Sequence, residues 1–244
     1  MKTELIKEVK KIEKKEKVKV LFLIESGSRA WGWESKDSDY DIRGVYIQDY
    51  QVVEEGKKQI DKPIGDLDIT LWDFRKFLRL MIKSNPSVWE WLSSDIVYID
   101  NFLRKKLKNI FERDFNRMKL KKHYSSMAKQ NFYKYINEIG DVANLKKYVY
   151  VLRSIACILW IEKHKSPPPK NYKKVINLFP ENIKKFFEKI VTEKKESEKL
   201  MGKRNKEAEK YILSFFNRDF GKEQDKFNIN EINKLFKSSL KWQS

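Results

Sequence analysis

The chain has 244 residues, of which 41% are hydrophobic, 14% aromatic and 36% charged, and its formal net charge is +18. With only eight glycines and six prolines, this composition excludes a disordered or fibrous chain and provides a core for one large domain or two small ones. A single cysteine, Cys157, excludes an internal disulfide, and an apolar run of at most seven residues, 155–161, excludes a membrane span. The mixed acidic and basic N-terminus does not match a secretory signal, so we expect a cytoplasmic protein.

The first part of the chain alternates short apolar segments with turn signals. Apolar residues at helical spacing in residues 3–16 predict an amphipathic surface helix. Residues 18–25 are short, branched and apolar, as in a buried strand, and they end at the turn-forming Ser26-Gly27-Ser28. Residues 39–48 and 67–71 predict two further strands.

Helical signals dominate the rest of the chain. Asp73 is expected to cap a helix that runs to about Lys83, and Asn85 followed by Pro86 begins another. Farther along, apolar residues recur every three or four positions. The breaker Ser166–Pro169 predicts a loop between two of these helices.

The charge divides the chain in a similar way. Residues 1–100 carry 18 basic and 19 acidic side chains, whereas residues 101–244 carry 35 and 16. Lys and Arg dominate non-specific affinity for nucleic acids, so a nucleic acid is an expected partner, with a merely solvated lysine-rich surface as the alternative. We predict an α+β fold with an N-terminal domain, residues 1–112, that has a mixed sheet and flanking helices. An all-helical basic domain, residues 113–244, follows it.

The connection between the first two predicted strands carries the clearest chemistry. The first strand ends at Gly27-Ser28, ten residues follow, and the second strand opens with Asp39 and Asp41. Alternate residues of a strand share a face, so these two carboxylates project together, about 7 Å apart, as hard oxygen donors suited to Mg²⁺. Gly27 permits close approach of the backbone to a phosphate, and Ser28 offers a hydroxyl and an N–H. The arrangement suits a triphosphate held between this turn and Mg²⁺.

This combination of strand, Gly-Ser turn and acidic pair resembles the signature of the DNA polymerase beta-like nucleotidyltransferase superfamily. A longer match, densest over residues 22–92, is similar to the predicted nucleotidyltransferases associated with RNA repair. The segments that carry it are Gly27–Gly32, Ser38–Tyr46, Phe74–Leu78 and Asn85–Pro86. The resemblance implies a nucleotidyltransferase domain over residues 1–112.

The superfamily completes its metal site with a third carboxylate on a neighbouring strand, and Asp68 is the best match. An ionised Asp68 within an apolar strand is costly unless it faces a metal or a partner. Asp66 remains the alternative, although its place beside Gly65 suits a turn.

The resemblance implies a two-metal mechanism with Mg²⁺, or Mn²⁺ in its place, and a nucleoside triphosphate, with ATP favoured. In it, Asp39 and Asp41 hold the ion that binds the β- and γ-phosphates, and Asp68 helps to hold the ion that activates an acceptor hydroxyl. Asp68 is also a candidate proton acceptor.

Basic side chains near the turn are candidates for stabilising phosphate charge. Arg29 and Arg43 flank the acidic pair in sequence. The alternative for each is an ion pair with a nearby carboxylate such as Glu34 or Asp37.

In related transferases a helical domain contributes nucleotide contacts, and by that analogy Lys147, Tyr148 and Arg153 are candidate nucleotide-binding residues. Trp31 and Trp33 either stack on a base or belong to the core. Three lysine pairs predict solvated helix faces or, together, a groove for RNA. They are Lys173 and Lys174, Lys184 and Lys185, and Lys194 and Lys195.

We therefore expect an enzyme that transfers a nucleotide from a triphosphate to an RNA end. A transferase that adenylylates a protein or a small molecule is the first alternative. A non-catalytic nucleic-acid-binding protein on the same scaffold is the second.

Overall fold

The computed structural model describes residues 2–35, 38–49, 58–137, 140–196 and 200–240, so Asp37 lies outside the described residues. The chain divides into two compact units. Unit 1 contains residues 1–30, 39–115 and 225–244, and unit 2 contains residues 31–38 and 116–224.

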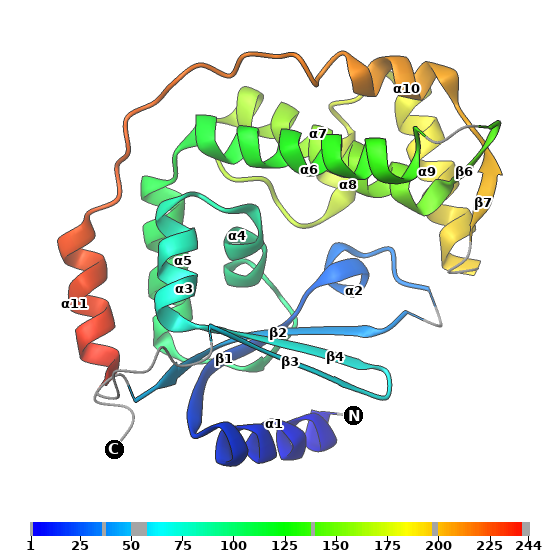
Figure 1. Cartoon of the computed structure of the whole chain (residues 1–244). Helices are drawn as coiled ribbons and strands as arrows, with labels where there is room; N and C mark the ends of the chain where they lie inside the picture. Colours follow the sequence, from blue (N-terminus) through cyan, green and yellow to red (C-terminus); the bar gives the residue numbers. More distant parts are fainter. Residues whose placement is uncertain (1, 36–37, 50–57, 138–139, 197–199, 241–244) are drawn as a thin grey trace. The chain divides into compact units, whose positions relative to one another are not determined.

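Unit 1 is built on a five-stranded mixed sheet (Figure 1). Its strand order is β3-β4-β2-β1-β5, and β2 and β4 are parallel whereas the other neighbours are antiparallel. The elements in chain order are α1 (Lys2–Glu16), β1 (Val18–Glu25), α2 (Gly27–Trp31), β2 (Tyr40–Gln48), β3 (Gln59–Ile64), β4 (Leu67–Asp73), α3 (Phe74–Ile82), α4 (Pro86–Leu92), β5 (Val97–Ile99), α5 (Phe102–Asp114) and α11 (Ile229–Ser239).

Helices cover both faces of this sheet (Figure 1). The apolar stripe of α1, with Leu5 and Val9 at its centre, packs on one face and is almost completely buried. On the other face, the ring of Phe22 in β1 meets Phe77 of α3 edge to face, with 5.6 Å between ring centroids. Because helices bury both faces of the sheet, consecutive residues of β1 are apolar instead of alternating with polar ones.

Unit 2 is mainly helical. Its core includes Trp33, which is fully buried and lies 5.3 Å from the ring of Tyr172 and 6.0 Å from that of Phe187. The elements are α6 (Arg117–Tyr135), β6 (Val142–Asn144), α7 (Leu145–His164), α8 (Tyr172–Ile176), α9 (Glu181–Glu196), β7 (Met201–Lys203) and α10 (Lys206–Leu213). Strands β6 and β7 form a two-stranded antiparallel sheet.

The predicted α+β class is confirmed, and so are the two cap signals. Asp73 accepts hydrogen bonds from two backbone N–H groups of α3, and Asn85 accepts one from α4. Cys157 is buried, as expected for a small apolar side chain. No helix within the described ranges has the length and apolar content needed to cross a membrane.

The structure differs from the predicted organisation in two respects. The region expected to be entirely helical contains the small β6–β7 sheet, which the sequence does not predict. The compact units also do not follow a single boundary near residue 112, because residues 31–38 cluster with unit 2 and residues 225–244 cluster with unit 1. The physical reason is packing: Trp33 enters the core of unit 2, and the ring of Phe236 in α11 lies 5.9 Å from that of Phe74 in α3.

Candidate active site

Two of the predicted carboxylates lie side by side on the parallel strands of unit 1. Asp41 of β2 and Asp68 of β4 are direct partners in the strand register. A single nitrogen, Nη2 of Arg43, donates to Oδ1 of Asp41 and to Oδ2 of Asp68, and both distances are 2.7 Å. The two carboxylates therefore converge on one cationic group. Asp39 lies immediately before β2 and is exposed.

Gly27 is required where it stands because its backbone lies against the Asp41 carboxylate. Its φ is +60°, which favours glycine, and a Cβ at this position would overlap Oδ2 of Asp41. The neighbouring Ser26 N–H donates to the carbonyl oxygen of Asp41 at 2.8 Å. The turn after β1 and the start of β2 are thus held in direct contact.

Glu25, the last residue of β1, is a member of this cluster that the sequence analysis missed. It is fully buried, and its carboxylate accepts hydrogen bonds from the Asp41 backbone N–H at 2.8 Å and from the Tyr98 hydroxyl at 2.6 Å. Burial raises the pKa of Glu25, and these two hydrogen bonds partly offset the rise. The sequence does contain a signal for this role, because Glu25 is an acidic residue at the end of an otherwise apolar strand. Glu25 positions the backbone of Asp41.

The two arginines near the turn have different surroundings. Arg43 forms ion pairs with Asp41 and Asp68, so the alternative prediction of an ion pair with a nearby carboxylate holds for Arg43, with these two partners in place of Glu34. The guanidinium of Arg29 lies over the ring of Tyr40, 3.9 Å from its centroid. Ser28 is buried in α2, with 7% of its surface exposed.

The donor set fits a hard divalent cation, although no group of three or more His, Cys, Asp or Glu within the described ranges is arranged as a metal cluster. Oxygens of Asp41 and Asp68 already lie at equal distances from one cationic nitrogen, and carboxylate oxygens are ligands that Mg²⁺ prefers. Asp66 lies in the turn between β3 and β4, beside Gly65 with its φ of +55°. The geometry therefore favours Asp68 over Asp66 as the partner of Asp41.

In unit 2 the structure brings two of the three predicted helical residues together. Lys147 and Arg153 line a cavity of about 290 Å³, with Trp31 and Tyr150 in the same wall. Tyr148 does not reach this cavity because it is fully buried elsewhere. Residues two positions apart on a helix face roughly opposite sides, so Tyr150 occupies the place expected for Tyr148.

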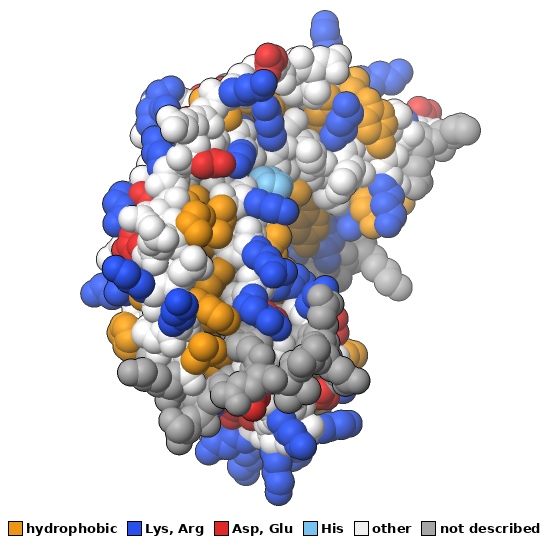
Figure 2. Space-filling model, turned by 60° about the vertical axis from the view of Figure 1, so that its left-hand side comes forward, with side chains coloured by type: hydrophobic (Ala, Val, Ile, Leu, Met, Phe, Trp, Pro, Cys, Tyr) orange, Lys and Arg blue, Asp and Glu red, His pale blue; other side chains and the backbone are white. Residues whose placement is uncertain are grey.

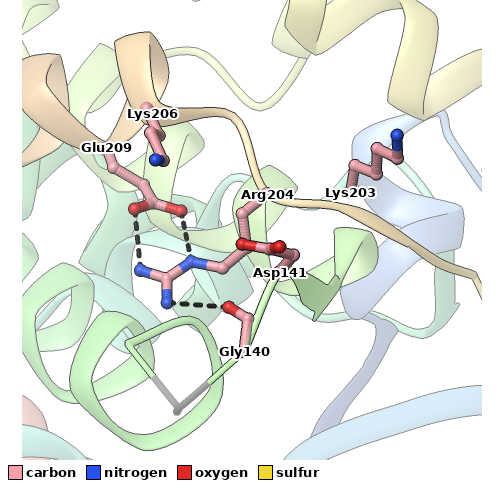
Figure 3. Close-up of a pocket in the computed structure, with 6 residues that line it drawn as sticks. All are labelled: Gly140, Asp141, Lys203, Arg204, Lys206 and Glu209. Atoms are coloured by element: carbon pink, nitrogen blue, oxygen red, sulfur yellow. Dashed lines mark hydrogen bonds and ion pairs between the residues drawn. The ribbon is translucent and has the colours of Figure 1, made fainter.

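Tyr148 belongs to a separate polar cluster with Glu209 and Arg204. Glu209 and Arg204 line a second cavity of about 320 Å³ (Figure 3). The Tyr148 hydroxyl donates to Glu209, which also forms a bidentate pair with Arg204 at 2.8 and 2.9 Å. Burial raises the pKa of Glu209, but the hydrogen bonds from Arg204 and Tyr148 outweigh burial and leave that pKa below its ordinary value. The charges of Arg204 and Glu209 neutralise each other, so we assign this cluster a role in the stability of unit 2.

One member of the predicted lysine groove is not on the surface. Lys194 is fully buried, and its Nζ donates to the carbonyl oxygen of Trp33 at 3.3 Å. It therefore holds the segment around Trp33 against α9. Lys173 and Lys174 are exposed on α8, which fits both a solvated face and part of a groove.

Comparisons with known proteins add an independent finding. A family model described as the RNA repair pathway DNA polymerase beta family matches residues 1–238. The uncharacterised protein YcgL of Bacillus subtilis (strain 168) is 41% identical over 207 residues, which cover 82% of this chain and 79% of YcgL. The uncharacterised protein MJ0002 of Methanocaldococcus jannaschii is 28% identical over 141 residues, which cover 55% of this chain and 56% of MJ0002. A solved nucleotidyltransferase-like protein from Exiguobacterium sibiricum 255-15 aligns with 15% identity and a TM-score of 0.31, over 93% of this chain and 72% of that one.

Proposed function

Because the chain belongs to the RNA repair pathway DNA polymerase beta family, we propose that it transfers a nucleoside monophosphate from a nucleoside triphosphate to the hydroxyl of an RNA end. ATP is the favoured donor. The family supports a nucleotidyltransferase-type function. The observation that carries the proposal is the pairing of Asp41 with Asp68 across the parallel strands, where both carboxylates converge on a single cationic nitrogen.

In this proposal Asp41 and Asp68 would hold the metal with oxygens from neighbouring strands. Asp39, which is exposed immediately before β2, would join them as the third carboxylate when the metal binds. Mg²⁺, or Mn²⁺ in its place, neutralises phosphate charge and lowers the pKa of the acceptor hydroxyl when bound. Glu25 fixes the backbone of Asp41 through its hydrogen bond to the Asp41 N–H. Precise placement of Asp41 is therefore built into the end of β1.

The remaining residues of the turn bind the triphosphate. Gly27 leaves no side chain between the turn and the carboxylates. Ser28, which is 7% exposed, would contribute its hydroxyl and backbone N–H. Arg29 and Arg43 offset the negative charge that develops on the phosphates. In the reaction the acceptor oxygen forms a bond to the α-phosphorus, and the bond from that phosphorus to pyrophosphate breaks. Asp68 accepts the proton of the hydroxyl.

Transfer of radioactive label tests the proposal. The wild-type chain and Asp41→Ala are incubated with Mg²⁺, total RNA, cell extract and each nucleoside triphosphate labelled at the α-phosphate. We expect nuclease-sensitive label, strongest with ATP, that disappears in the variant. Protease-sensitive label would instead identify a protein acceptor, and absence of label with every triphosphate would favour a non-catalytic binding protein.

A further inference from the structure

The cavity on unit 2 combines aromatic rings with basic side chains, and we refer to it as the aromatic pocket. Helix α7 supplies one wall, α6 supplies another, and Trp31 closes a third side. Its volume is about 290 Å³. The described residues that line it are Trp31, Met127, Asn131, Lys146, Lys147, Tyr150, Arg153 and Ser154.

The rings of the aromatic pocket lie close to cations. The rings of Trp31 and Tyr150 meet edge to face, with 5.8 Å between centroids. The guanidinium of Arg153 lies 4.1 Å from the centroid of the Trp31 ring. Nζ of Lys147 lies 4.0 Å from the ring of Tyr135 and 5.6 Å from that of Tyr150. Flat aromatic surface and positive charge are therefore presented within one small space, which is the chemistry that binds a nucleobase and its phosphate.

The charge of the surroundings has the same sign. The eight described lining residues include three cations and no carboxylate. Unit 2 as a whole contains 27 Lys and Arg against 14 Asp and Glu, a net charge of +13, whereas unit 1 contains 26 against 21, a net charge of +5. Figure 2 shows one face of the molecule, on which Lys and Arg side chains are spread more widely than Asp and Glu side chains. Such a surface attracts a polyanion.

We propose that the aromatic pocket binds one unstacked nucleotide of a single-stranded nucleic acid, which under the proposed function, on which this inference rests, is the acceptor RNA. The base packs against the rings of Tyr150 and Trp31. Lys146, Lys147 and Arg153 bind the adjoining phosphate. A duplex binds less tightly, because its bases are already stacked on one another.

Fluorescence anisotropy of a labelled single-stranded oligoribonucleotide tests the inference, with the full-length chain in a metal-free buffer containing EDTA. Loss of one stacking surface weakens RNA binding by about 10-fold, so Tyr150→Ala is expected to raise Kd by that factor. Lys147→Ala is expected to raise Kd and to lower the slope of log K against log salt by about one. Tyr150→Phe keeps the ring and is expected to bind as the wild type does.

Two matched substitutions outside the pocket serve as controls. Tyr133→Ala removes a half-exposed tyrosine of α6, and Lys189→Ala removes an exposed lysine of α9. Both are expected to change Kd by less than about 2-fold, because neither residue lines the pocket. The same comparison in the Asp41→Ala background keeps RNA binding separate from transfer, so a chain without transferase activity still reports on the pocket.

Three results would overturn the inference. One is equal affinity for RNA in Tyr150→Ala, Lys147→Ala and the two controls. Another is loss of binding in Tyr150→Phe as large as that in Tyr150→Ala, which would indicate a structural role of the residue. The third is displacement of the oligoribonucleotide from the wild type by ATP but not from Tyr150→Ala, which would make this a mononucleotide pocket.

Discussion

The carboxylates of unit 1 and the aromatic pocket of unit 2 balance their charges in different ways. In unit 1, Asp41 and Asp68 share one guanidinium nitrogen of Arg43, so two negative groups converge on a single positive one. In unit 2, Arg153 and Lys147 lie over ring faces, and no carboxylate is among the described residues that line the pocket. The first arrangement has an excess of negative charge and suits a cation. The second has an excess of positive charge and suits an anion with a flat base.

The largest expected effect distinguishes Asp68, which lies in β4, from Asp66, which lies in the turn before this strand. Asp68→Asn is expected to lower nucleotidyl transfer by more than about 100-fold, because changes beyond the ligand shell of a metal already cost about 10–100-fold. Asp66→Asn is expected to stay within about 2-fold, since Asp66 lies in the turn beside Gly65. Rates of label transfer measure both. Full activity in Asp68→Asn with loss in Asp66→Asn would reverse the assignment.

The next comparison uses two glycines with nearly the same backbone conformation. Gly27 has φ +60° and Gly65 has φ +55°, but only at Gly27 would an added Cβ overlap the carboxylate of Asp41. Gly27→Ala is therefore expected to lower the free energy of unfolding by about 2 kcal/mol more than Gly65→Ala does. Urea denaturation gives this difference. Equal losses in the two variants would show that the conformation alone, and not contact with Asp41, requires glycine.

A smaller effect is expected at the polar cluster of Tyr148, Arg204 and Glu209 in unit 2. Glu209→Gln removes the charged partner of Arg204 and is expected to lower the free energy of unfolding by about 1.5 kcal/mol at pH 7. Because the pKa of Glu209 lies below its ordinary value, its stabilisation is present above about pH 4.5 and is lost as the pH falls further. The wild type and the variant should therefore converge in acid. A difference that grows below pH 4.5 would contradict the lowered pKa.

The smallest expected effect concerns the difference between the aromatic pocket and the cavity beside Glu209, both in unit 2. Glu209→Gln is expected to leave the affinity for single-stranded RNA within about 2-fold, because Glu209 lines the other cavity. Anisotropy with the same oligoribonucleotide measures this. An effect on RNA binding as large as that of Tyr150→Ala would mean that the two cavities are not functionally separate.

The sequence predicts part of the carboxylate site. The apolar neighbours of Asp68 mark it as a strand residue, and it lies in β4. Alternation predicts that Asp39 and Asp41 share one side of a strand, but β2 begins at Tyr40, so Asp39 lies just before it. The parallel register that makes Asp41 and Asp68 direct partners depends on pairing between segments far apart in the chain. Glu25 was missed for the same reason, since its two donors belong to β2 and β5.

Long-range packing also explains the remaining differences. Helical spacing groups Tyr148 with its neighbours, but only its partner Glu209, 61 residues away, decides that it faces the interior. Lys194 is typical of a surface lysine, yet the carbonyl of Trp33, 161 residues away, makes its burial tolerable. Nothing in the local sequence predicts that α11 belongs to unit 1, where Phe236 contacts Phe74.

The central claim is that the chemistry belongs to the carboxylates of unit 1 and that RNA binding belongs to the aromatic pocket of unit 2. The most direct measurement is to determine label transfer and RNA affinity together for wild type and Asp41→Asn. We predict that Asp41→Asn loses transfer by more than about 100-fold while its Kd for the oligoribonucleotide stays within about 2-fold of the wild type. Transfer that persists in Asp41→Asn would contradict the account, and so would a parallel loss of RNA binding.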